Sequence, residues 1–245
     1  MTATLVAPAK LTWSLRVTGV RDDGHHLIDA EMVALSLGDV LSVDELDGGD
    51  GALTVGGPFA AGVPLDATNL VTKALRAAGR SARVHVDKHI PHGGGLGGGS
   101  SDAAAVLRWA GIADLGIGAR LGADVPFCMV GGRARVRGVG EIVDALQPLE
   151  RVVTLVIPPL SCSTPAVYAA WDALGGPAVD GPNDLEPAAL AVEPRLERWR
   201  DRIAEAAGTR PALAGSGATW FVEGDRPEIA VALDGATVIV ARTTG

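Results

Sequence analysis

The chain has 245 residues, of which 47% are apolar, and carries a net charge of −8 at pH 7. It is long enough to bury one large or two modest cores, and its acidity argues against broad binding to nucleic acid. With no apolar run that could span a bilayer and no signal-peptide pattern, we expect a cytoplasmic protein that makes no membrane contact and acts as a monomer or homodimer.

Strand and helix patterns alternate along the first half of the chain. The segments 3–17 and 32–43 are predicted strands that flank the polar turn GVRDDGHH with its Asp-Gly pair. Apolar spacing followed by glycine predicts a helix over 69–79, and the alternation in RVHVDKHI predicts a strand over 83–90. The segment SSDAAAVLRWA then predicts a helix that begins at serine.

The second half of the chain also alternates between predicted strands and predicted helices. Its predicted elements are a strand pair at 131–143, a buried strand from 151, helices at 164–174, 186–191 and 194–207, the segment 211–224, a short helix near 227–233 and the final strand ATVIVA. Runs of strands mixed with helix pairs predict an α+β fold. We place a boundary near residue 150, which gives an N-terminal domain 1–150 and a C-terminal domain 151–245.

The segment IPHGGGLGGGSSDAA at 90–104 has six glycines within seven residues. Glycine exposes backbone N–H groups and permits positive φ, and the helix that follows adds its unpaired N-terminal donors and the positive end of its dipole. The loop therefore predicts an anion cradle, for which a nucleotide triphosphate such as ATP is the natural ligand. Ser100 and Ser101 can cap the helix, touch a phosphate oxygen or help to place Mg²⁺.

Three other interpretations of this loop are weaker. A flexible connection would normally lack the fixed strand and helix on its two sides. A dinucleotide-binding turn would fit Gly93, Gly95 and Gly98, with Asp114 as the acidic partner, but Asp114 does not end a second buried strand. A P-loop would need a Gly-Lys-Ser/Thr sequence after the glycines, and none follows.

Three segments in order resemble the GHMP kinases: PHGGGLGGGSSDAA, APAKL at 7–11 and AGSGAT at 214–219. Further segments are similar to the branch of that family that phosphorylates a hydroxyl of a cytidine-diphosphate-linked methylerythritol, an isoprenoid precursor, so the resemblance covers nearly the whole chain. These segments are RDDGHHLIDAEMVALSLGDVL, LGADVPF, GVGE, STPAVY and NDLEP.

The resemblance implies a two-domain α+β fold, with an N-terminal domain like domain 2 of ribosomal protein S5 and a ferredoxin-like C-terminal domain. It also implies ATP and Mg²⁺, with ATP and the small-molecule substrate meeting between the domains. The loop residues that it assigns to the nucleotide are Pro91, Gly93, Gly94, Gly95, Leu96, Gly97, Gly98, Gly99, Ser100 and Ser101, with Ser100 and Ser101 as candidates for the metal.

The catalytic positions that the resemblance implies are Lys10 and Asp124. A carboxylate can accept the proton of an attacking hydroxyl, while an ammonium group stabilises that carboxylate and the developing alkoxide. Each residue also has a structural alternative, because Asp124 can cap a helix or turn and Lys10 can extend from a strand edge to solvent.

For the substrate, the resemblance implies Thr12, His25, His26, Pro165, Tyr168, Gly215, Ser216 and Gly217. His25 takes a position that is commonly Tyr and stacks on the cytosine, His26 hydrogen-bonds the base edge, and Tyr168 forms a second aromatic wall. A solvated turn residue is the alternative for His25.

Three features depart from the family pattern. Thr12 replaces a common Asn, and its shorter hydroxyl can leave the contact with the substrate to water. Asp102 replaces another common Asn and adds a negative charge near the phosphates, which a metal or a cation must offset. The segment RWAGIADLGIGARLG is also shorter than its counterparts. A homoserine or mevalonate type of GHMP kinase and a nucleotide-binding pseudokinase therefore stay open as alternatives.

Overall fold

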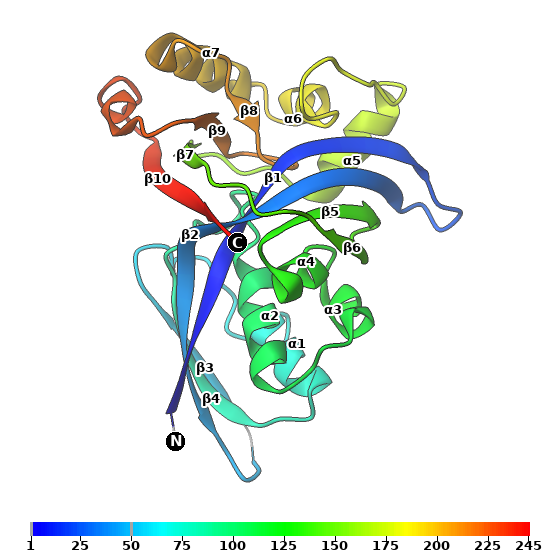
Figure 1. Cartoon of the computed structure of the whole chain (residues 1–245), viewed down its shortest axis with the longest axis vertical. Helices are drawn as coiled ribbons and strands as arrows, with labels where there is room; N and C mark the ends of the chain where they lie inside the picture. The colour runs from blue at the N-terminus through cyan, green and yellow to red at the C-terminus, as the bar shows by residue number, and fades with distance from the viewer. Residues whose placement is uncertain (1, 50) are drawn as a thin grey trace.

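A long antiparallel hairpin of β1 (Thr2–Val20) and β2 (His26–Glu45) runs through the middle of the molecule (Figure 1). The computed structural model describes residues 2–49 and 51–245. On its side away from β1, β2 pairs in turn with three other strands along its length. The hairpin is therefore the element to which the rest of the sheet attaches.

The remaining strands extend this hairpin into one continuous sheet. They are β3 (Ala52–Gly56), β4 (Ala82–Asp87), β5 (Arg133–Gly138), β6 (Ile142–Ala145), β7 (Val152–Ile157), β8 (Ala212–Leu213), β9 (Trp220–Glu223) and β10 (Thr237–Thr244). The main path runs β3-β4-β2-β10-β7-β9-β8, and β5 and β6 pair beside β2. Because β10 pairs with both β7 and β2, the last strand of the chain links the C-terminal strands to the hairpin.

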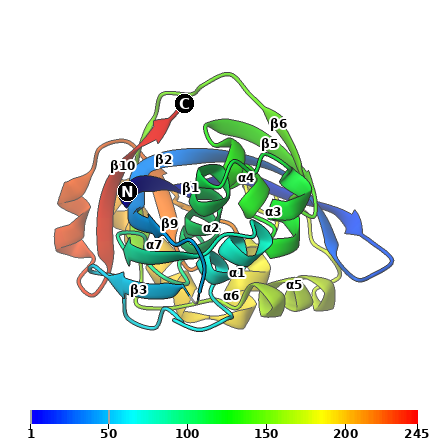
Figure 2. The ribbon, with the colours of Figure 1, turned by 90° about the horizontal axis from the view of Figure 1, so that it is seen from below.

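The helices gather in two groups that lie on opposite sides of the hairpin in Figure 1, and Figure 2 shows the same groups from below. The first group contains α1 (Leu70–Ala77), α2 (Gly98–Trp109), α3 (Leu115–Leu121) and α4 (Val125–Val130). The second contains α5 (Thr164–Ala173), α6 (Glu186–Val192), α7 (Arg195–Ala207) and the 3-10 helix η1 (Pro227–Ala232). Helix α2 is buried from Ser101 to Leu107, and its small alanine side chains let it lie close to β1.

The predicted α+β fold is confirmed, while the predicted boundary at residue 150 stays a prediction. Sequence patterns missed β3, α3 and α4, and the two helix omissions have a physical reason. Helix α4 is buried on almost every side, so it shows no amphipathic period, and α3 contains two glycines. Among the described residues, no helix is both long and apolar enough to cross a membrane.

Candidate active site

Lys10 projects from β1 at a point where the pairing with β2 is irregular. The register shifts between Pro8 and Lys10 and again between Thr12 and Ser14. Bulges of this kind redirect side chains, and alternate residues of a strand share a face. Accordingly the Lys10 ammonium donates to the Thr12 hydroxyl at 3.2 Å, although both residues are almost completely buried.

Asp124 stands at the N-cap position of α4, but its side chain makes no capping hydrogen bond within the described chain. Its Oδ2 instead lies 3.1 Å from the Lys10 ammonium. The Lys10 side chain is 6% exposed and that of Asp124 is 31% exposed. A buried cation thus holds a carboxylate that solvent or a ligand can still reach, which suits a group that accepts a proton.

The glycine loop is packed tightly against its protein neighbours. Gly97 has φ of +69°, and a Cβ added there would lie 2.6 Å from the Lys10 Cγ. Gly95 has φ of +79°, and a Cβ there would lie 2.8 Å from the Ala214 carbonyl oxygen. These two glycines therefore let the loop approach Lys10 and the AGSGAT segment, in addition to leaving room for an anion.

A cavity of about 290 Å³, here called the loop cavity, opens above the start of α2. Its lining includes the predicted residues Pro91, Gly93, Gly94, Gly95, Leu96, Gly97, Gly98, Gly99 and Ser100. Ser101 is absent from this lining: it is fully buried, and its hydroxyl donates to the Pro8 carbonyl at 2.6 Å. Its position therefore supports anchoring of the loop to β1 rather than contact with a phosphate or metal.

Beneath the loop lies a buried charge cluster that sequence reasoning missed, made of Asp39, Lys88 and Asp102. The Lys88 ammonium contacts Asp39 and lies 2.8 Å from Asp102 Oδ2. Asp39 also accepts the backbone N–H groups of His89 and Ile90. Lys88 thus provides a cation that offsets the charge of Asp102.

The carboxyl of Asp102 is only partly satisfied. Its Oδ1 has no hydrogen-bond partner within residues 2–49 and 51–245. Burial raises the pKa of Asp102 to about 7, with Lys88 opposing that rise and Asp39 adding to it. One signal of this cluster was present in the sequence, Asp102 in place of a common Asn. That signal indicated an unusual charge but did not identify Lys88 as its partner.

A second cavity of about 610 Å³, here called the main cavity, adjoins the first. The predicted residues in its lining are Lys10, Thr12, His25, His26, Asp124, Pro165, Tyr168, Gly215 and Ser216. Gly217 lies outside this lining and packs against the glycine loop instead. Gly95 and Gly97 line both cavities, so the two spaces meet beside the Lys10–Asp124 pair.

One part of the lining of the main cavity is aromatic. His26, at the start of β2, stacks on Tyr168 of α5 with ring centroids 4.6 Å apart. Burial raises the pKa of Tyr168 to about 12, so this phenol stays neutral. The His25 side chain is 64% exposed and pairs with Asp23, which gives it less contact with the cavity than His26 has.

Asn183, in the NDLEP segment, is a second residue whose role sequence reasoning missed. Its side-chain amide donates to the carbonyls of Leu213 and Gly215, and its Oδ1 accepts from the Leu185 N–H. It also forms a β-bridge with Leu15 of β1. Asn183 therefore ties the AGSGAT segment to β1 and fixes one wall of the main cavity.

Known proteins that resemble this chain include members of one kinase family. The family described as GHMP kinases N terminal domain matches residues 67–132, which include the glycine loop. The protein named 4-diphosphocytidyl-2-C-methyl-D-erythritol kinase in Paracoccus denitrificans (strain Pd 1222) is 40% identical over 234 residues, covering 88% of this chain and 84% of that protein. The protein of the same name in Jannaschia sp. (strain CCS1) is 40% identical, with coverage of 88% and 86%. The chain belongs to the 4-diphosphocytidyl-2-C-methyl-D-erythritol kinase family.

Solved structures agree with this family membership. The crystal structure of a 4-(cytidine 5'-diphospho)-2C-methyl-D-erythritol kinase superposes with a TM-score of 0.80 at 30% identity, covering 99% of this chain and all of that chain. A homoserine kinase from Cytophaga hutchinsonii has a TM-score of 0.65 at 18% identity, covering 99% of this chain and 94% of the other. At that identity the second likeness concerns the fold alone.

Proposed function

We propose that this chain transfers the γ-phosphoryl group of ATP to the 2-hydroxyl of 4-diphosphocytidyl-2-C-methyl-D-erythritol. One observation carries the proposal: the loop cavity and the main cavity meet at Gly95 and Gly97, next to the Lys10–Asp124 pair. A donor and an acceptor held in adjoining spaces need only a short path for phosphoryl transfer, and positioning of this kind supplies much of the catalysis.

The nucleotide is assigned to the loop cavity. Backbone N–H groups at the start of α2 and the helix dipole favour a polyphosphate there, and Asn69 and Leu70 are also among the residues that line the space. In this proposal the loop positions the γ-phosphoryl group near Gly97, where the cavities join.

The Lys10–Asp124 pair is assigned to the acceptor. Asp124 accepts the proton of the attacking hydroxyl, and the Lys10 ammonium stabilises the negative charge on both oxygens. No covalent enzyme intermediate is needed. Thr12 receives a hydrogen bond from Lys10, so its own hydroxyl proton is free to be donated to the acceptor.

The donor set fits a magnesium ion that is held mainly by substrate phosphates. The described residues contain no group of three His, Cys, Asp or Glu side chains that could hold a metal, which suits an ion that keeps several waters and phosphate oxygens. Ser100, which lines the loop cavity, is the residue proposed to hold it. When bound, Mg²⁺ neutralises charge on the transferring phosphoryl group.

The aromatic part of the main cavity supports an acceptor that carries a pyrimidine nucleotide. Tyr168 offers a flat surface for stacking, and His26 offers polar ring atoms at the base edge. Homoserine and mevalonate have no aromatic base and would leave this part unused. We therefore favour the cytidine-linked substrate over these alternatives, with the cytoplasm as the proposed location and a monomer or homodimer as the proposed assembly.

The test measures ADP release by the purified protein with ATP and Mg²⁺. Three acceptors are offered in parallel: 4-diphosphocytidyl-2-C-methyl-D-erythritol, homoserine and mevalonate. We expect turnover of the first only. Turnover restricted to homoserine or mevalonate would overturn the specific substrate, and no turnover of any acceptor, with ATP still bound, would indicate a pseudokinase.

A further inference from the structure

Asp172 has no part in the chemistry described above, yet it lines the main cavity and contacts His26, which lines it too. The Asp172 Oδ1 lies 2.8 Å from His26 Nε2. This contact joins α5 to the start of β2. The His26 side chain is 10% exposed, whereas that of Asp172 is 51% exposed. The carboxylate therefore stands at the rim and holds a ring that is nearly buried.

Aromatic neighbours restrict the same ring from two other directions. Tyr168 stacks on it at 4.6 Å with an interplanar angle of 30°, and Trp171 meets it edge-on at 5.7 Å. Tyr168, Trp171 and Asp172 all belong to α5. One short helix thus supplies both the packing and the hydrogen bond that orient His26.

The contact with Asp172 decides what His26 can offer to a ligand. An ionised carboxylate only accepts hydrogen bonds, so the ring nitrogen that faces it carries the hydrogen. In a neutral imidazole this places the hydrogen on Nε2 and leaves Nδ1 as an acceptor. Since Asp172 occupies Nε2 and His26 lines the main cavity, Nδ1 is the ring nitrogen left for a ligand.

We propose that Asp172 is a positioning residue that fixes His26 as a hydrogen-bond acceptor, so that the site selects cytosine over uracil. Cytosine carries an exocyclic amine that donates, whereas uracil carries a carbonyl oxygen at the same place that only accepts. Nδ1 of a neutral His26 therefore pairs with the amine and faces the uracil oxygen without a hydrogen between them. The inference rests on the proposed function and adds to it the origin of base selectivity.

The kinetic test compares Asp172→Ala with wild type on two acceptors, the cytidine-linked substrate and its uridine-linked analogue. We expect KM for the cytidine substrate to rise about 10-fold and the preference for cytidine to fall by about the same factor, because the acceptor is no longer fixed. Neither kcat nor KM for ATP should change by more than about twofold, since Lys10 and Asp124 are untouched.

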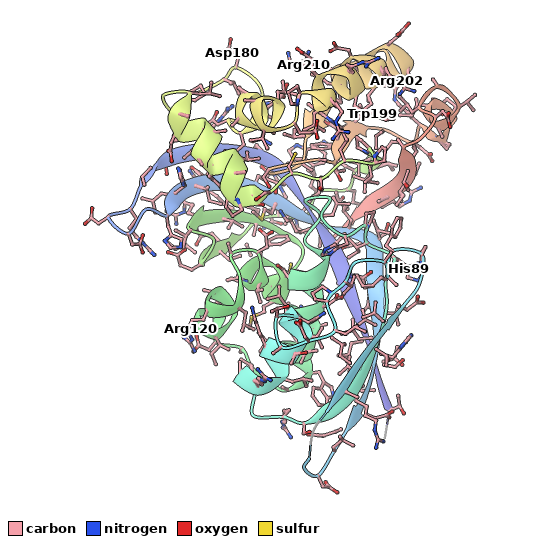
Figure 3. All side chains as sticks on the ribbon, turned by 180° about the vertical axis from the view of Figure 1, so that it is seen from behind. His89, Arg120, Asp180, Trp199, Arg202 and Arg210 are labelled. Carbon is pink, nitrogen blue, oxygen red and sulfur yellow. The ribbon has the colours of Figure 1, made fainter. Side chains whose placement is uncertain are left out.

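Asp180→Ala is the matched control. Asp180 is exposed on the loop between α5 and α6, where Figure 3 labels it, and its removal changes the net charge by the same amount. This variant should keep the wild-type ratio of cytidine to uridine turnover. An equal loss of selectivity in both variants would assign the effect to net charge and overturn the role of Asp172.

A spectroscopic arm tests the positioning directly, without turnover. Long-range ¹H–¹⁵N correlation spectra of the full chain should show neutral His26 protonated at Nε2 in the wild type and a mixture of both tautomers in Asp172→Ala. A wild-type ring protonated at Nδ1 would overturn the inference.

The two proposals fail in different ways. A wild type that phosphorylates none of the acceptors overturns the proposed function and the base selectivity with it. Wild-type turnover of the cytidine substrate, with an unchanged cytidine preference in a folded Asp172→Ala, overturns only the role of Asp172.

Discussion

Two lysines lie against consecutive glycines of the same loop and have different roles. Lys10 packs against Gly97, and its ammonium reaches Asp124, which is 31% exposed. Lys88 lies beneath Gly98, and its ammonium bridges Asp39 and Asp102, whose side chains are 0% and 6% exposed. The first pair opens to the main cavity, whereas Asp39 has no access to solvent at all.

The difference between the two pairs is a matter of access rather than of chemical type. A carboxylate that a substrate can reach can take up a proton during a reaction, whereas a buried one only balances charge within the fold. Because Lys88 and Asp102 also line the loop cavity, we expect changes at Lys88 to lower stability and to weaken the proposed nucleotide site, and changes at Asp124 to act mainly on turnover.

Replacing Lys88 by Met should produce the largest effect. It removes the cation that both Asp39 and Asp102 contact, and breaking a buried ion pair in this way costs about 3–5 kcal/mol of unfolding free energy. Chemical denaturation measures the loss. Lys73→Met is the control, because Lys73 is exposed on α1 and its replacement should change stability by no more than about 0.5 kcal/mol. Equal stability of the two variants would refute the buried role of Lys88.

Asp124→Asn should lower kcat by roughly 10²-fold or more, the scale expected for a positioned proton acceptor. The amide keeps the shape of the side chain but does not accept the proton of the hydroxyl. Steady-state kinetics should show KM for ATP nearly unchanged, because the loop cavity lacks Asp124 in its lining. A variant with the wild-type rate would remove Asp124 from the mechanism.

Gly97→Ala tests the close approach of the loop to Lys10. Gly111 also has positive φ, but a Cβ there would meet nothing within 4 Å, so Gly111→Ala carries a similar backbone strain without a clash. The backbone strain alone should lower stability by about 1–2 kcal/mol in each variant, and the clash with Lys10 adds to the loss in Gly97→Ala. Only Gly97→Ala should also lower kcat, by roughly 10- to 100-fold, because its Cβ displaces Lys10. Similar kcat values in the two variants would show that Lys10 tolerates the added methyl.

Asp102→Asn should have almost no effect near pH 4 and a stabilising effect that grows as the pH rises toward 7. The folded pKa of Asp102 is raised to about 7, so the folded chain holds a proton on Asp102 that the unfolded chain has already lost above about pH 4. Stability from this group is therefore present at low pH and declines as the pH rises toward and through 7. The amide mimics the protonated acid and removes this decline.

Melting temperatures of both proteins between pH 4 and 8 measure this effect. The variant should match the wild type near pH 4 and exceed it increasingly up to about pH 7, and parallel curves across the range would contradict the assignment.

Much of the site was predictable from the sequence because it lies in short contiguous segments. The glycine loop, the start of α2, Lys10 and Asp124 each follow from local patterns or from the motifs that contain them. The roles of Lys88, Asp172 and Asn183 were not predictable in this way. Their partners lie far away in the chain, as Asp39 does for Lys88 and His26 does for Asp172, and no local pattern encodes such a pairing.

Local sequence dictates where backbone donors and turn-forming glycines occur, because φ preference and helix initiation depend on a residue and its nearest neighbours. Which side chains meet depends instead on how the strands and helices pack. The bulged register of β1 on β2 aims Lys10 at Asp124, and α5 packs beside the start of β2 so that Asp172 reaches His26. Contacts of this kind depend on register and on the packing of whole elements, which are properties of the complete fold.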